Sequence, residues 1–239
     1  MLLSSKFNIC LIPYGGGTNV TRALSIPENE NRMVVSVDMR RMSKIEWINS
    51  EDRRVCVQAG ITGGELIEVL KEKGFTIGHE PDSVELSTVG GWVATNASGM
   101  KKNRYGNIED IVENISLVSP KGVIKQINPI SRGSIGFKPQ NVLFGSEGNI
   151  GIITKVILKM HEIPHAQKYN SVIFKQWSDG VGFVKELSKT NFIPASVRLV
   201  DNIQFRFGQA LKPRPEGIKK YKSIIEKFFV TKVKKFDPD

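Results

Sequence analysis

Three consecutive glycines stand at the end of an apolar run near the start of the chain. The run covers residues 8–13, and the glycine segment comprises Pro13, Tyr14, Gly15, Gly16, Gly17, Thr18 and Asn19. Because glycine has no Cβ, successive N–H groups there can turn toward one anion without steric cost, which predicts a cradle for a pyrophosphate. A Walker A loop is excluded because no Gly-Lys-Ser/Thr follows, and Val20 replaces the third glycine of a dinucleotide fingerprint. The alternative is a plain tight turn.

A second segment, residues 81–99, is nearly free of bulky aliphatic side chains and rich in small hydroxyls. It holds Pro81, Asp82, Ser83, Ser87, Thr88, Gly90, Gly91, Trp92, Thr95, Asn96, Ala97, Ser98 and Gly99. Such a stretch lets the backbone lie flat against a planar ligand while hydroxyls and amides contact its polar edge. The alternative is a glycine-rich loop that packs closely against another strand.

A third glycine-punctuated turn covers residues 144–153 and leads into a strand. Glu147 lies in this turn and fits a solvent-exposed turn residue as well as it fits a ligand contact.

The order and separation of these segments resemble the FAD-binding domain of the vanillyl-alcohol-oxidase flavoprotein superfamily. Within that superfamily, several motifs resemble the alkylglycerone-phosphate synthase (alkyl-dihydroxyacetone-phosphate synthase) family. They are Gly-His-Glu-Pro-Asp-Ser at 78–83, Thr-Val-Gly-Gly-Trp at 88–92, Ala-Ser-Gly-Met-Lys-Lys-Asn at 97–103, Tyr-Gly-Asn-Ile-Glu-Asp at 105–110 and Pro-Ala-Ser-Val-Arg-Leu at 194–199. The resemblance covers essentially the whole chain, and a generic flavin oxidase does not need the Met-Lys-Lys-Asn run.

The resemblance implies an α+β fold. An FAD-binding domain of the vanillyl-alcohol-oxidase (PCMH) type would cover residues 1–163, and the start of a mixed α/β substrate (cap) domain would cover 164–239. It also implies FAD bound without a covalent link. The residues implied to contact FAD are Pro13, Tyr14, Gly15, Gly16, Gly17, Thr18, Asn19, Asp82, Ser83, Val84, Glu85, Leu86, Ser87, Thr88, Thr95, Asn96, Ala97, Ser98, Glu147, Gly148, Asn149, Ile150, Gly151, Ile152 and Ile153.

The reaction implied by the resemblance is the exchange of the acyl group of acyl-dihydroxyacetone phosphate for a long-chain fatty alcohol, which forms the ether bond of ether lipids. No net oxidation occurs, so the flavin would act covalently through N5 as an electron sink for the dihydroxyacetone-phosphate carbon. Arg198 lies in the family's Pro-Ala-Ser-x-Arg-Leu element and is the implied catalytic residue. The alternatives are an FAD-linked 2-hydroxy acid oxidase or dehydrogenase, and an inactive flavoprotein that serves as an interaction module.

The family's FAD domain begins before Met1 and its substrate domain continues beyond Asp239, where a catalytic tyrosine and a histidine-rich loop are expected. The chain is therefore expected to be part of a longer protein, or a truncated form of one. Asn149 stands where the family has threonine, which preserves a polar turn. The resemblance further implies a peroxisomal homodimer with peripheral membrane contact, with its targeting signal upstream of Met1.

The charge balance agrees with a phosphorylated ligand. Lys+Arg 34 against Asp+Glu 24 gives a formal net charge of +10, which attracts anions. No zinc-finger spacing, basic region with heptads or RNP pattern is present, so nucleic acid is not an expected partner. Lys101, Lys102, Arg104 and Arg198 are candidate anion contacts, although both lysines also fit a solvated surface.

The remaining titratable residues give weaker signals. His79, in a Gly-His-Glu-Pro turn, fits either a catalytic base or a hydrogen-bonded loop histidine. No histidine and carboxylate spacing indicates a metal site. Cys10 and Cys56, each inside a predicted buried strand, indicate reduced thiols and a reducing compartment.

The elements that position these segments follow from hydrophobic patterning. Strands are predicted over residues 8–13, 33–38, 55–59 and 151–160, and a hairpin over 115–118 and 123–127. Thr62 and Glu65 form a capping box before Leu66 and Leu70, which predicts a helix ending at Gly74.

A change of pattern at residues 161–165 predicts a domain boundary. Beyond it, strands are predicted over 169–174 and 195–200, and helices over 180–190 and 217–230. The last helix fits either a core-facing helix with a solvated lysine face or a membrane-docking face.

Overall fold

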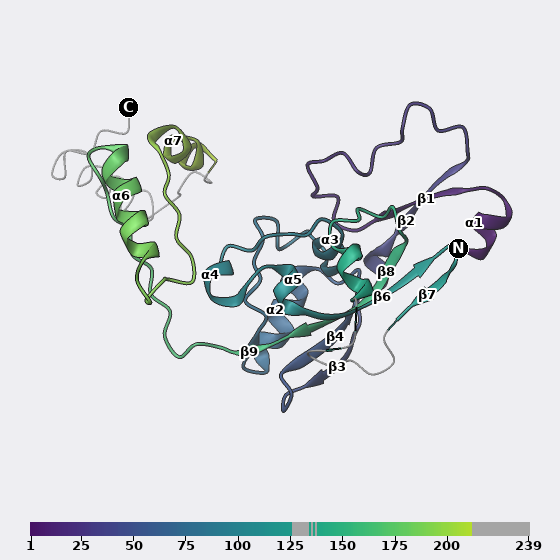
Figure 1. Cartoon of the computed structure of the whole chain (residues 1–239), viewed down its shortest axis with the longest axis horizontal. Coiled ribbons are helices and arrows are strands. Elements are labelled where there is room, and N and C mark those ends of the chain that lie inside the picture. Colours follow the sequence, from purple (N-terminus) through teal and green to yellow (C-terminus); the bar gives the residue numbers. More distant parts are fainter. Residues whose placement is uncertain (126–133, 135, 137, 212–239) are drawn as a thin grey trace, which may run out of the picture. The chain divides into compact units, whose positions relative to one another are not determined.

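The computed structural model describes residues 1–125, 134, 136 and 138–211 of the chain. These fall into two compact units, Met1–Gln167 and Lys168–Asp239, which are described separately (Figure 1). Residues 126 and 127, the last two of the predicted hairpin, lie outside the described residues, and so does the predicted helix over 217–230. In the described part of the chain, no helix is both long and apolar enough to cross a membrane.

The first unit is built on a five-stranded antiparallel sheet with the order β3-β4-β8-β6-β7. The strands are β3 (Ile45–Asn49), β4 (Arg54–Gln58), β6 (Val112–Ser119), β7 (Gly122–Ile124) and β8 (Ile152–Lys159). The predicted strands at β4 and β8 and the predicted hairpin of β6 and β7 are confirmed. β3 is an addition to the prediction, and it pairs with β4 at the sheet edge.

Helix α2 (Gly63–Glu72) confirms the capping-box prediction. The Glu65 N–H donates to the Thr62 hydroxyl over 3.3 Å, and the Glu65 carboxylate accepts from the Thr62 N–H over 3.1 Å. Leu66 and Leu70, one turn apart, are fully buried, so one face of the helix packs into the core. Gly74, with φ +80°, continues the chain in the left-handed region that follows many helices.

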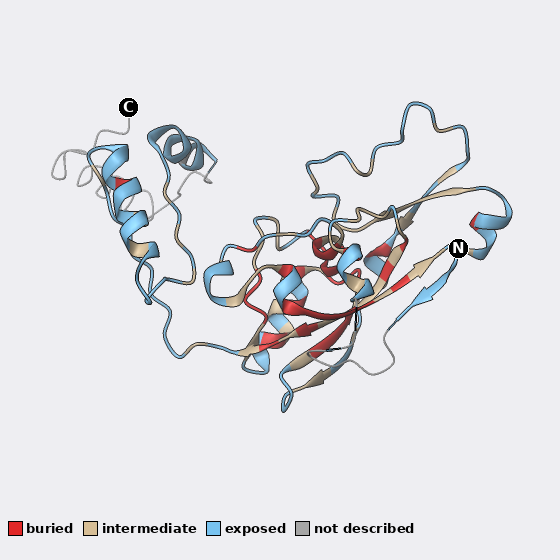
Figure 2. Cartoon of the chain, viewed as in Figure 1, coloured by how far each residue is buried: buried red, intermediate tan, exposed pale blue. Residues whose placement is uncertain are grey.

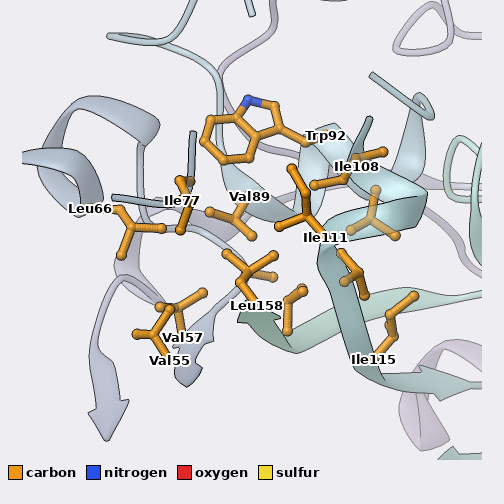
Figure 3. Close-up of a cluster of buried hydrophobic side chains, with 14 of the residues drawn as sticks. Val55, Val57, Leu66, Ile77, Val89, Trp92, Ile108, Ile111, Ile115 and Leu158 are labelled. Atoms are coloured by element: carbon orange, nitrogen blue, oxygen red, sulfur yellow. The ribbon is translucent and has the colours of Figure 1, made fainter. Parts of the chain in front are cut away.

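The core lies between the sheet and three helices, α2, α3 (Val89–Ala94) and α5 (Ile108–Ile111). Figure 3 shows Leu66, Ile77 and Val89 above the sheet residues Val55 and Val57, with Trp92 at the top of the cluster. The indole nitrogen of Trp92 points away from the apolar side chains. Buried residues are concentrated here, while the helices described in the second unit are mostly exposed (Figure 2).

A separate parallel pair joins β1 (Cys10–Tyr14) and β2 (Val34–Asp38), which confirms the predicted strands at 8–13 and 33–38. Residues 15–33 connect the two strands as a long loop without helix or strand (Figure 1). Both cysteines are free thiols, as predicted; Cys56 is buried but Cys10 is only half-buried. Burial raises the pKa of the Cys56 thiol.

Several short elements carry no clear hydrophobic period and were not predicted. They are α1 (Leu2–Lys6), the 3-10 helices η1 (Met39–Arg41) and η2 (Pro139–Leu143), β5 (Phe75–Thr76), α3, α4 (Lys102–Tyr105), α5 and β9 (His161–Glu162). β5 and β9 pair with each other at the end of the first unit.

The second unit contains α6 (Trp177–Ser188) and α7 (Asn202–Ala210). The predicted helix over 180–190 is confirmed but begins three residues earlier, whereas α7 was not predicted. The predicted strands over 169–174 and 195–200 are wrong. An apolar run forms a strand only beside a partner with which to exchange hydrogen bonds, and the described residues of this unit contain no strand. Phe174 and Leu199 instead pack around Gly180 of α6.

Candidate functional site

The three glycine-rich segments meet at one place in the first unit. A methyl group on Gly16 would collide with the carbonyl oxygen of Leu86, so only glycine lets the first segment approach the second this closely. A methyl group on Gly148 would lie 3.0 Å from the Pro13 ring, which brings the third segment against the first. The Glu147 N–H donates to the Ala94 carbonyl over 2.9 Å and joins the third segment to the second.

The segments enclose a cavity of about 360 Å³. Predicted site residues in its wall are Pro13, Gly15, Gly16, Gly17, Thr18, Asn19, Ser83, Ser87, Thr88, Thr95, Ala97, Glu147, Gly148, Gly151 and Ile153. Tyr14, Asp82, Val84, Glu85, Leu86, Asn96, Ser98, Asn149, Ile150 and Ile152 were also predicted but do not line it. The wall also contains Val20, Thr21, Ala23, Leu24, Met39, Ala59, Pro81, Gly90, Gly91, Trp92 and Ala94.

Some of these additional wall residues could have been predicted from the sequence, and others could not. Pro81, Gly90, Gly91 and Trp92 belong to the glycine-rich second segment itself. Ala59 and Met39 come directly after β4 and β2 in the structure, at turns of the kind that commonly form binding sites, although the predicted strand over 55–59 included Ala59. Residues 20–24 have no distinctive composition and could be located only from the fold.

The backbone of the first segment has hydrogen-bond donors available. The N–H groups of residues 16–19 donate no hydrogen bond within the described part of the chain. Backbone N–H groups are obligatory donors, so a row of them at a cavity wall binds an anion well. This geometry fits the predicted pyrophosphate cradle.

The hydroxyls of the second segment mainly hold α3 in place. The Thr88 hydroxyl accepts from the Gly91 N–H over 3.2 Å at the start of this helix, and the Thr95 hydroxyl donates to the Gly91 carbonyl over 2.9 Å. The Trp92 indole N–H donates to the Ser87 hydroxyl over 2.7 Å. The prediction of a backbone lying flat therefore needs correction over residues 89–94, because small residues with a threonine cap form a short helix there.

His79 is fully buried beside the cavity wall, with its ring centroid 5.0 Å from that of Trp92 in an edge-on arrangement. Neither ring nitrogen has a hydrogen-bond partner among the described residues, so the prediction of a hydrogen-bonded loop histidine is wrong. Burial lowers the pKa of His79 from 6.5 to about 4, which keeps the ring neutral near pH 7. The Ser146 hydroxyl oxygen, next in sequence to Glu147, is also buried without a hydrogen-bond partner among the described residues.

The candidate cations are placed differently from one another. Lys101 forms an ion pair with Glu80 at 2.5 Å, and only 22% of its side chain is exposed, so neither a solvated lysine nor a free anion contact describes it. Lys102 and Arg104 are exposed, and Arg104 stacks over the Tyr105 ring at 5.6 Å. Arg198 is exposed in the second unit and does not line the cavity.

Charge is scarce in the cavity wall, where Glu147 is the single ionisable residue among those described. The residues that the structure describes contain no group of His, Cys, Asp and Glu side chains that could hold a metal ion. The wall therefore offers backbone donors, small polar groups and apolar surface for an uncharged ring system with a phosphate group.

The family model of the FAD binding domain matches residues 1–128, more than half of the chain. The chain belongs to the FAD-binding domain family. FAD is the cofactor of this domain, and the cavity fits it on two observations. In the described part of the chain, the N–H groups of residues 16–19 donate no hydrogen bond and can meet a pyrophosphate. His79 and Ser146 hold buried polar atoms without partners among the same residues.

This FAD-binding domain chain is also similar to longer proteins. It is 46% identical to the alkyldihydroxyacetonephosphate synthase of Caenorhabditis elegans over 97% of its own length and 39% of that protein. It is 35% identical to the Dictyostelium discoideum enzyme of the same name over 98% of its own length and 38% of that protein. A solved alkyldihydroxyacetonephosphate synthase structure matches 99% of this chain and 42% of its own, with a TM-score of 0.84 and 33% identity.

These comparisons confirm the resemblance inferred from the motifs and the predicted fold class. The chain spans about two fifths of the length of these two curated relatives.

Proposed function

We propose that this chain takes part in forming the ether bond of ether lipids, by exchange of the acyl group of acyl-dihydroxyacetone phosphate for a long-chain fatty alcohol. One observation carries the proposal. The similarity to alkyldihydroxyacetonephosphate synthases covers 97% of this chain and so continues well beyond residue 128, where the FAD-binding domain match ends. FAD-linked relatives with other activities are less similar: the mitochondrial D-lactate dehydrogenase of Arabidopsis thaliana is 28% identical over 84% of this chain, against 46% over 97% for the Caenorhabditis elegans synthase.

The cofactor would occupy the cavity of the first unit. The N–H groups of residues 16–19 would bind the pyrophosphate, and the second and third segments would line the flavin and ribityl chain. Bound FAD would supply an electron sink, which allows an exchange without net oxidation. The buried Trp92 and Ile153 in the cavity wall would exclude water from the cofactor.

The second unit would contribute to the substrate site. We infer that it begins the substrate domain and that Arg198 binds the phosphate of the substrate. Its exposed guanidinium has the forked geometry that pairs with phosphate oxygens. The whole protein would act as a peroxisomal homodimer in peripheral contact with a membrane, as the family resemblance implies.

Transfer of labelled fatty alcohol into alkyl-dihydroxyacetone phosphate tests the proposal, in a version of the protein extended to the length of its relatives. We expect transfer with the wild-type sequence, and at least a hundredfold loss with Arg198→Ala, because several charge-assisted hydrogen bonds to phosphate would be removed. Lys102→Ala, which removes an exposed cation from the first unit, is the matched control and should retain activity.

Two outcomes would count against the synthase. Bleaching of the flavin by a 2-hydroxy acid would identify an oxidase or dehydrogenase. Stoichiometric FAD without either reaction would identify a flavoprotein that acts as an interaction module.

A further inference from the structure

One wall of the cavity is formed by an exposed loop. Val20, Thr21, Ala23 and Leu24 line the cavity and belong to the long connection between β1 and β2 (Figure 1). Val20 is 94% exposed, so this wall has solvent on its outer side and little core packing behind it. Segments with few buried contacts open readily, and this wall needs another interaction to stay in place.

That interaction joins Thr21 to Glu147. The Thr21 hydroxyl donates a hydrogen bond of 2.7 Å to a carboxylate oxygen of Glu147, 126 residues further along the chain. Among the described residues, it is the one hydrogen bond from residues 20–24 to the second or third glycine-rich segment; the Thr21 hydroxyl also lies 3.5 Å from the side-chain oxygen of Asn19, two residues earlier in the loop. The backbone N–H of Glu147 is itself bound to Ala94 in α3, so the acceptor is attached to the folded core.

The backbone at Glu147 supports a specific role for its side chain. Its φ of +47° is in the left-handed region, where a residue other than glycine is uncommon and strained. Gly145 and Gly148 on either side also have positive φ, so the turn as a whole is left-handed at several positions. Glycine would relieve the strain at 147 but would remove the carboxylate that Thr21 contacts.

We propose that Thr21 and Glu147 form a latch that holds residues 20–24 over the cavity and controls how fast FAD leaves. Thr21 is a positioning residue in this proposal, because it acts through the loop wall and through Glu147. The hydrogen bond is exposed to solvent, so it opens often enough for the cofactor to enter. The proposal rests on FAD as the ligand of the cavity and does not require the synthase reaction.

Trypsin cleavage after Arg22 reports directly on this loop, because Arg22 is the residue next to Thr21 and is exposed. A protease needs the chain to leave the folded surface, so the cleavage rate follows the open fraction of the loop. The experiment compares the full 239-residue chain with Thr21→Val, Thr21→Ser and Glu147→Ala. FAD dissociation after dilution is followed by flavin fluorescence on the same proteins.

Thr21→Val should increase both the cleavage rate and the FAD dissociation rate about threefold to tenfold, because this is the change in the open fraction expected when one hydrogen bond is lost. Thr21→Ser should restore both rates, because serine keeps the donor. The double variant Thr21→Val with Glu147→Ala should cleave no faster than the faster single variant, since the two residues share one interaction. Glu28→Gln, which removes an exposed carboxylate from the same loop, is the matched control and should behave as wild type.

Equal rates for wild type and Thr21→Val would overturn the proposal, and so would failure of Thr21→Ser to restore them. A wild-type chain in which saturating FAD does not slow cleavage after Arg22 would overturn it as well. If the cleavage and FAD dissociation rates change as expected but the extended protein transfers no alcohol, the synthase proposal would be refuted and the latch proposal would not.

Discussion

The indole N–H of Trp92 donates to the hydroxyl of Ser87 over 2.7 Å, and both side chains are buried where the core meets the cofactor cavity. Ser87 precedes the cap of α3 and Trp92 lies within that helix, so the bond fixes the helix against the turn before it. Without Ser87, the indole would keep its apolar packing but lose the only acceptor that the described residues provide.

Ser87→Ala should therefore lower the free energy of unfolding by about 1–3 kcal/mol, the cost of a buried donor left unpaired. Urea denaturation followed by tryptophan fluorescence measures the change. Ser98→Ala is the control, because the exposed Ser98 hydroxyl donates to the Asn107 side chain over 2.9 Å and has no other partner among the described residues. A Ser87→Ala protein as stable as the Ser98→Ala protein would show that water replaces the lost acceptor.

Gly16→Ala should weaken FAD binding at least tenfold, because the added methyl group would collide with the Leu86 carbonyl and push the cradle away from the second segment. Titration of the apoprotein with FAD gives the affinity. Gly64→Ala is the matched control, since its methyl group would lie 3.5 Å from Glu85 Cα and would favour helix α2. Equal affinities for the two variants would rule out the close approach as a determinant of the site.

The free energy of unfolding should fall as the pH is lowered from about 6.5 to about 4, because in this range His79 takes up a proton when the protein unfolds. Burial lowers the pKa of folded His79 to about 4 from 6.5, so between these values the unfolded state binds more protons. The stabilisation is complete above about pH 6.5 and is lost toward pH 4, an effect of about 3 kcal/mol. The pKa of His161 is also lowered, by burial and by Arg104, Lys159 and Arg53, and adds in the same direction.

Urea denaturation between these pH values measures this slope. His79→Phe should reduce it, whereas His165→Gln should not, because the His165 side chain is exposed. A slope that stays unchanged in His79→Phe would assign the effect to other groups.

FAD affinity should depend little on salt. No lysine or arginine lies in the cavity wall formed by the described residues, so the cofactor phosphates would meet uncharged N–H groups. Screening by salt weakens contacts between charges more than hydrogen bonds to backbone dipoles. We expect less than a twofold change in affinity between about 50 and about 500 mM NaCl. A tenfold decrease would indicate that cations from elsewhere, such as Arg198, reach the cofactor.

The sequence predicted those helices and strands whose formation depends on a few neighbouring residues. The capping box fixed the start of α2, and the apolar runs located β1, β2, β4 and β8. The glycines predict a cradle, which stays a prediction, because the absence of a Cβ is a property of the residue itself. Each of these features can be read from a few neighbouring residues.

Features that depend on distant partners were not predictable in this way. The hydrogen bond between Thr21 in the loop wall and Glu147 joins residues that are 126 positions apart. The burial of His79 depends on Trp92, and the pairing of Lys101 depends on Glu80, which are contacts that the sequence does not reveal. In the second unit, the apolar runs at 169–174 and 195–200 predict strands, but neither run has a strand partner among the described residues.

The position of β8 has a consequence for how the molecule acquires its cofactor. β8 lies at the centre of the five-stranded sheet, between β4 and β6, yet β4 precedes it in the chain by more than ninety residues. Pairings between strands so far apart in sequence form slowly, because the intervening chain must first be closed into a loop. The third glycine-rich segment leads directly into β8, so the cavity is completed only when this strand docks. During synthesis, residues 13–19 would leave the ribosome long before there was a site for them to complete, and loading with flavin would be one of the last events in folding.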